Sequence, residues 1–260
     1  LDAESRMTVL ERLRGRLVGL ALLSVASLAA ATPTTNPCSA GLALPPRAAM
    51  ASGGLEFARR IAASSGLERD RAIVREILAG NVPGHLRQAL PVVLEAKRPG
   101  PSSRVTVCVL PDYLAVGSDA DFLLVPLGLG AALEVAGALG FTLPTRRIVD
   151  AIHDQASVRL DPLPLPAGDE MRSTAYVQRH NAMVLVQRAR VHAPAAALVA
   201  GQKKDLVLTR LLWSHPGRVA IYGWHRLDGS AIQPLSIVHG ARYAHYSHGV
   251  RLVSDVAFVD

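Results

Sequence analysis

The sequence predicts an α+β fold in which N-terminal and central helices pack on a mostly antiparallel C-terminal sheet. Three observations indicate this class: a helical period of apolar residues from Gly54, short β-branched runs after Ala200, and no strict alternation of strand and helix. Residues 54–260 are long enough for one sizeable core, and no change of composition divides them. We therefore expect one domain there.

The helical period runs from Gly54 to Ala96, with leucine and isoleucine spaced between arginine and glutamate. Gly80 should close one helix, and Pro91 should kink or end the next. From Arg104 the pattern changes to β-branched and aromatic runs, VTVCVL, YLAV and FLLV. These runs predict two or three strands.

Three further helices are predicted in the centre of the chain, at residues 128–139, 145–155 and 173–190. Thr145 is the expected N-cap of the second, because it follows a proline and precedes an amphipathic run. The proline-rich connector LDPLPLPAGDE separates the second helix from the third.

After Ala200 five apolar runs predict strands: DLVLT, RVAIYGW, AIQPLSIV, GVRLV and VAFV. Asp228 and Gly229 lie between the second run and the third, and glycine supplies the positive φ that a tight hairpin demands. An antiparallel sheet follows from that hairpin. Because Asp260 comes directly after an apolar run, we expect the natural chain to continue beyond it.

Residues 1–31 are interpreted as a secretory signal peptide with a few upstream residues. Three arginines precede the uncharged run Leu17–Ala31, which ends in three alanines. The run is shorter than the roughly 20 apolar residues that span a bilayer, so we expect no stable membrane span after cleavage. A buried helix of the mature domain is the alternative interpretation. The expected location is secreted or periplasmic.

Residues 32–53 are rich in proline and alanine and have no hydrophobic period, so we expect a linker with little order. The chain has two cysteines, Cys38 and Cys108. Export would permit a disulfide between them. Cys108, however, lies in the apolar run VTVCVL, which is typical of a buried thiol, and we expect the thiol.

The chain is basic, with a net charge of +7, yet nearly all of its 28 basic residues are arginines spread along the sequence. No basic run exceeds two residues, which favours a compositional bias over a binding surface and argues against nucleic-acid binding. The sequence contains no G-x-x-x-x-G-K-[ST] loop and no G-x-G-x-x-G turn after a strand, so we expect no nucleotide cofactor.

Histidine placement is the strongest indication of chemistry. Seven of the nine histidines lie between residues 180 and 248, and four fall at the ends of predicted strands: His225, His239, His245 and His248. If the hairpin brings His225, His239 and His248 together, three imidazoles could hold one zinc ion with a position open for water. The expected cofactor is therefore none or a single divalent metal.

The same region supports a reaction without metal. A histidine such as His225 or His248 would be the general base, oriented by Asp205, and Ser247 or a water would be the nucleophile. Developing negative charge would be stabilised by a cation. The remaining candidates for this site are Tyr246, Lys204 and Arg251. Structural histidines at strand ends are the competing interpretation.

Three smaller features also carry polar groups. Lys203 and Lys204 open a predicted strand, either as placed cations or as a solvated strand start. His180 lies in a predicted helix and could point into a site with the sheet histidines, or it could belong to a polar helix face. Asp150 and His153, three residues apart on a helix, are most simply a surface pair.

These observations predict an exported hydrolase that acts on a cell-envelope or extracellular polymer through the histidine-rich site. The alternative is a non-catalytic envelope protein that binds an anionic polymer or a protein partner through basic and aromatic residues. Export itself disfavours chemistry that depends on ATP or NAD. The sequence therefore narrows the expected function to hydrolysis or binding.

Overall fold

The fold is α+β, with helices and antiparallel sheet both present, as the sequence predicts. The computed structural model describes residues 37–38, 41–95 and 104–259, all of them in the unit Thr35–Asp260. The expected signal peptide and the end of the chain lie outside the described residues. Among these residues, no helix combines the length and the apolar character needed to cross a membrane.

Helices occur along most of the described part of the domain. α1 and α2 come first, α3 and α4 occupy the centre, and α5 is the longest. Their bounds are α1 Gly54–Arg60, α2 Gly66–Leu78, α3 Leu129–Ala138, α4 Arg146–Gln155, α5 Thr174–Arg190 and α6 Leu211–Ser214, with short 3₁₀ turns η1 Gly84–Arg87 and η2 Asp169–Arg172. Ser173 caps α5, because its hydroxyl accepts a hydrogen bond from the Tyr176 N–H.

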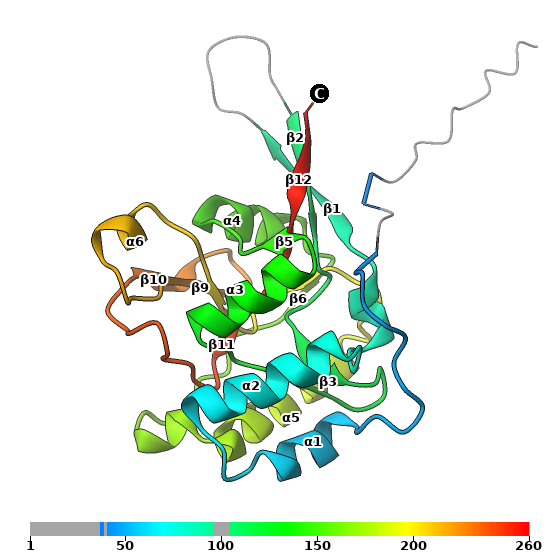
Figure 1. The fold of residues 1–260 in the computed structure, drawn as a ribbon. Helices are drawn as coiled ribbons and strands as arrows, with labels where there is room; N and C mark the ends of the chain where they lie inside the picture. The colour runs from blue at the N-terminus through cyan, green and yellow to red at the C-terminus, as the bar shows by residue number, and fades with distance from the viewer. Residues whose placement is uncertain (1–36, 39–40, 96–103, 260) are drawn as a thin grey trace, which may run out of the picture. The chain divides into compact units, whose positions relative to one another are not determined.

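One four-stranded sheet has the order β1-β2-β12-β5 and is antiparallel throughout. The last strand of the chain therefore lies beside β2 in its centre (Figure 1). Its strands are β1 Leu90–Glu95, β2 Arg104–Val109, β5 Phe141–Thr142 and β12 Val253–Val259. The short pair β3 Ala115–Gly117 and β4 Phe122–Leu124 forms a separate hairpin that α1 contacts.

The second four-stranded sheet has the order β10-β9-β8-β11. β8, β9 and β10 are antiparallel, whereas β11 runs parallel to β8. The strands are β8 Lys204–Leu206, β9 Ile221–His225, β10 Ala231–Ser236 and β11 His248–Gly249, and a further parallel pair joins β6 Val158–Arg159 to β7 Val199–Ala200. The predicted hairpin is confirmed: Ala231 pairs with His225, and Gly229 has φ +86°.

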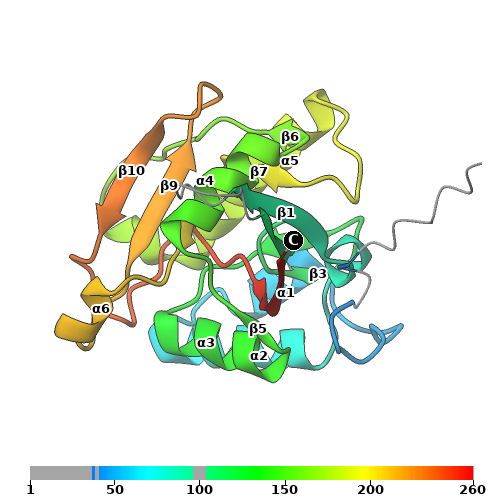
Figure 2. The same cartoon turned by 90° about the horizontal axis from the view of Figure 1, so that it is seen from above.

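Helix α4 joins the two sheets, since it contacts β1 on one side and β9 on the other (Figure 2). Its inner face carries Val149, Ile152 and His153, all buried. The largest core cluster lies among α1, α2, α5 and the β3–β4 hairpin, with Phe57, Ile73 and Val184 fully buried.

Two expectations about the first half of the domain are wrong. Residues 90–95 form β1 rather than the end of a helix, and the Cys38 and Cys108 side chains form a disulfide rather than leaving a buried thiol at Cys108. Pro91 is compatible with β1 because the strand lies at the edge of its sheet, where a missing N–H is tolerated.

The segment expected to be a loosely ordered linker is held against the domain where the structure describes it. Residues 41–53 contain no helix or strand, yet Leu42 is buried and joins the core. The Arg47 guanidinium donates hydrogen bonds to Asn81 Oδ1, at 2.9 Å, and to the Gly117 carbonyl, at 3.1 Å. Together with the disulfide, these contacts order a segment of low hydrophobic periodicity.

Candidate functional site

His225 is held by helix α4. Its Nε2 lies 3.1 Å from Asp150 Oδ1, and its ring stacks on His153 with centroids 4.7 Å apart. The Tyr222 hydroxyl donates to the same carboxylate oxygen at 2.7 Å. Asp150 and His153 are therefore not a surface pair: α4 packs on β9, which buries His153 and turns Asp150 toward the strand.

Four other histidines and two lysines gather around β8 and β11, in a group that we call the histidine cluster. Its members are His180 from α5, Lys203 and Lys204 at the start of β8, His239 and His245 from the loop before β11, and His248 from β11. Among the described residues, no ring contact joins His225 to this cluster. The structure thus divides the candidates into two places.

His245 and His248 face one another, although three residues apart they would diverge on a strand. Their ring centroids are 4.2 Å apart, because the chain turns between them and the His248 N–H donates to the His245 carbonyl at 2.9 Å. His239 lies 6.4 Å from His248, ring to ring, and stacks on Tyr243 at 4.0 Å. A turn therefore supplies the proximity that a strand would not.

Lys203 is buried inside the cluster. Its ammonium lies 3.2 Å from His180 Nδ1 and donates to the Tyr246 carbonyl at 2.5 Å. Within the described residues, no carboxylate oxygen lies within ion-pair distance of it. Burial lowers the pKa of Lys203 to about 7, and the charge of Asp112 opposes that shift only in part.

Lys204 carries the second positive charge of the cluster. Its Nζ lies 4.9 Å from the ring centroid of Trp224, a cation–π contact, and burial lowers its pKa. Trp224 is itself buried and has φ +55°, a left-handed conformation that costs free energy in a residue with a side chain. Such a cost is typical of residues held in place for a function.

The three buried histidines of the cluster are neutral at pH 7. Burial, with the charge of Lys203, lowers the pKa of His180 to about 2. Burial, with the charge of Lys204, lowers the pKa of His245 to about 3. Burial holds the pKa of His248 well below its usual value, and neither of its ring nitrogens has a hydrogen-bond partner among the described residues.

Ser247 contacts His245 directly. Its Oγ and its backbone N–H both lie 3.2 Å from His245 Nδ1, and the serine is fully buried. Tyr246 makes different contacts. Its hydroxyl accepts a hydrogen bond from the Leu165 N–H at 2.8 Å, and its ring lies 5.2 Å from the His180 ring, centroid to centroid. The serine thus has a hydrogen-bond acceptor in place, whereas the tyrosine hydroxyl holds the proline-rich connector.

Asp205 and Arg251 both contact Tyr113. The Tyr113 hydroxyl donates to Asp205 Oδ2 at 2.8 Å, and no hydrogen bond joins this carboxylate to a histidine among the described residues. Burial raises the pKa of Asp205 to about 7. Arg251 donates to the carbonyls of Leu110, at 2.9 Å, and Val199, at 2.6 Å.

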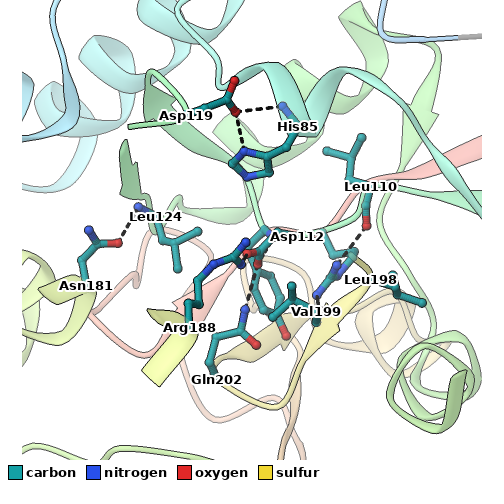
Figure 3. A network of polar contacts seen from close by, with 12 residues as sticks. His85, Leu110, Asp112, Asp119, Leu124, Asn181, Arg188, Leu198, Val199 and Gln202 are labelled. Atoms are coloured by element: carbon teal, nitrogen blue, oxygen red, sulfur yellow. Dashed lines mark hydrogen bonds and ion pairs between the residues drawn. The ribbon is translucent and has the colours of Figure 1, made fainter. Parts of the chain in front are cut away.

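A second buried polar group borders the cluster, and the sequence gives no sign of it (Figure 3). Asp112 accepts from Arg188 Nη1, from Gln202 Nε2 at 2.8 Å and from the Tyr113 N–H at 2.7 Å. We call it the Asp112 network. Its members lie up to 90 residues apart in sequence, so no local pattern could have indicated the contact.

The described part of the chain contains no group of three or more histidine, cysteine, aspartate or glutamate residues arranged to hold a metal ion. The zinc site stays a prediction, which elemental analysis of the purified protein would test. No protein-family model matches this chain, and no curated protein or solved structure is significantly similar to it. The chemistry is therefore argued from the site alone.

Proposed function

We propose that this chain is a hydrolase whose site is the histidine cluster, with protein side chains supplying the nucleophile and the base. We further propose that it acts outside the cytoplasm on an envelope or extracellular polymer. The proposed site rests on the geometry of the cluster, and the proposed location rests on the sequence of residues 1–31.

One observation carries the proposal: His248 is fully buried, and neither ring nitrogen has a hydrogen-bond partner among the described residues. A buried polar group without a partner costs about 1–3 kcal/mol, and a folded chain that retains several of them gains something other than stability. The pKa of Lys203 beside it, lowered to about 7 by burial, is typical of catalytic sites.

The roles follow from the contacts. Ser247 Oγ can donate its proton to His245 Nδ1, which makes the hydroxyl the nucleophile of an acyl transfer. His245 would then return the proton to the leaving oxygen or nitrogen, and a water would release the acyl group from the serine. Lys204, placed by Trp224, would stabilise the negative charge that develops on the substrate carbonyl oxygen.

The pH dependence follows from Lys203. Burial and the charge of Lys204 are the larger causes of the low His245 pKa, and the charge of Lys203 adds the smallest contribution, so protonated Lys203 opposes the proton transfer slightly. Because the pKa of Lys203 is about 7, turnover should rise as the pH passes through that value. A pH–rate profile of kcat/KM on the free enzyme measures it.

The test is a Ser247→Ala variant assayed on a panel of p-nitrophenyl acyl esters and acylated cell-wall fragments. We expect kcat/KM to fall by about 10²–10⁴, with the far-ultraviolet spectrum unchanged. His215→Gln is the matched control, because His215 is exposed and lies outside the cluster. Hydrolysis that survives Ser247→Ala at the native rate would refute the proposal, as would a native protein inert on the whole panel.

A further inference from the structure

A cavity of about 340 Å³ has Tyr243, which contacts His245 and His248, in its wall. Three arginines and one carboxylate line it, so the balance of formal charge is positive. These residues are Arg69, Arg172, Arg242 and Asp169. Arg172 and Arg242 are exposed, and their side chains can therefore reorient toward a ligand.

The two helices that begin at the cavity add to its positive potential. Ser65 and Gly66 open α2, of 13 residues, and Ser173 opens α5, of 17 residues. The N-terminus of a helix carries the positive end of its dipole and unpaired N–H groups. Ser65, the N-cap of α2, makes no side-chain cap, so no hydroxyl occupies those groups.

Arg69 is the buried member of the cavity wall, 2% exposed. Its guanidinium donates to the carbonyls of Arg172, at 2.5 Å, and Ala244, at 3.1 Å, and its Nε has no partner among the described residues. Burial lowers the pKa of Arg69, and the charge of Asp70 offsets that only in part. A buried cation held by carbonyls alone is the arrangement that a bound anion would stabilise.

Tyr243 joins the cavity to the proposed site. It lines the cavity, and its ring lies 5.3 Å from His245 and 5.8 Å from His248, centroid to centroid. Tyr243 is therefore both part of the cavity wall and a neighbour of His245 and His248.

We propose that this cavity is an anion subsite, which binds a carboxylate or phosphate group of the polymer beside the histidine cluster. The inference rests on the proposed function for its position relative to the reaction, but not for the binding itself. The shared chemistry of the ligand is an oxyanion, for which paired guanidinium groups are the preferred partners.

Calorimetric titration at low ionic strength tests the subsite with three probes: trigalacturonate, inorganic phosphate and neutral maltotriose. We expect the anions to bind and maltotriose not to bind, with affinity falling as salt is raised. A tighter complex with trigalacturonate would assign the group as a uronate carboxylate, and a tighter complex with phosphate would assign it as a phosphate.

The double variant Arg172→Gln/Arg242→Gln should weaken anion binding at least tenfold, because both side chains are exposed and their loss leaves the fold intact. Arg179→Gln removes an exposed arginine of α5 outside the cavity and should bind as the native chain does. Asp169→Asn should tighten binding. Equal binding by the double variant, or equal binding of maltotriose, would overturn the inference.

The same titration separates this inference from the proposed function. Ser247→Ala should lose turnover and keep the anion affinity, since Ser247 does not line the cavity. Anion binding by a chain without turnover would leave the subsite standing and refute the hydrolase. Hydrolysis of neutral substrates without anion binding would refute the subsite and leave the proposed hydrolase standing.

Discussion

Two buried polar groups meet at Gln202 and Lys203, neighbours in the chain, and they are built in opposite ways. In the Asp112 network the carboxylate is paired with Arg188 and also accepts two further hydrogen bonds (Figure 3). In the histidine cluster two lysines lie among neutral rings, and no carboxylate of the described chain is within ion-pair distance of them.

This difference in charge pairing distinguishes a group that stabilises the fold from a group retained for function. A buried ion pair with its remaining positions bonded holds the fold, and losing one partner leaves a charge without compensation. Buried cations without such a partner are costly in the folded state, so their retention indicates a task. Both groups are buried and polar, and they differ in whether the buried charge has an oppositely charged partner within ion-pair distance.

Replacing Asp112 tests the first half of this comparison and has the largest expected effect. Asp112→Ala should lower the free energy of unfolding by about 3–5 kcal/mol, because it leaves Arg188 and Gln202 buried without their acceptor. Urea unfolding at pH 7 measures it. Asp161→Ala, an exposed aspartate, is the control and should shift the value by less than about 0.5 kcal/mol. An Asp112→Ala protein of native stability would remove the contrast.

Replacing Lys203 tests the second half and should have the opposite sign. Lys203→Met should raise the free energy of unfolding at pH 6, since it removes a buried cation without an ion pair and leaves an apolar chain of similar length; the Tyr246 carbonyl and His180 Nδ1, which lose their donor, reduce the gain. Lys204→Met, at a partly buried position, should do the same to a smaller extent. A destabilised Lys203→Met protein would mean that this lysine holds the fold.

The pH dependence of that difference has a definite direction. The pKa of Lys203 is about 7 in the folded chain and about 10.4 in an unfolded one, so between these values the unfolded state binds more protons. The native protein should therefore gain stability relative to Lys203→Met as pH rises from 7 to 10. Below pH 7 the difference should be constant. Parallel urea curves from pH 6 to 10 measure it.

The sequence predicts most of the helices and the C-terminal hairpin, because their signals are local: α5 follows an N-cap serine, and Gly229 permits the turn. It fails at β1, where Pro91 indicates the end of a helix. Whether a proline is tolerated there depends on the position of the strand at a sheet edge, and that position is set by pairing with β2.

The site is predicted only as a region. The density of histidines points to the region before β11, but the partners of these side chains are set by distant elements. His180 meets Lys203 across 23 residues, and His225 meets Asp150 across 75. Such contacts depend on how α4 and α5 pack on the second sheet, and no spacing in the sequence encodes that packing.

Asp119 is a partly exposed carboxylate that pairs with His85, and replacing it should have the smallest effect on the free energy of unfolding. It accepts from the His85 backbone N–H at 3.0 Å and lies 2.7 Å from His85 Nδ1, and its side chain is 56% exposed. Solvent screens such a pair, so Asp119→Asn should lower the free energy of unfolding by only about 0.5–1 kcal/mol at pH 7.

Acid should abolish that small difference. Burial acts to raise the pKa of Asp119, but the hydrogen bonds from His85 outweigh it and lower the pKa below its ordinary value. The contribution is therefore present above the unfolded pKa of about 3.9 and is lost as pH falls through the folded value. Urea curves of native and Asp119→Asn protein should converge below pH 4. A loss as large as that of Asp112→Ala would show that exposure does not separate the two carboxylates, and that pairing alone decides their contribution.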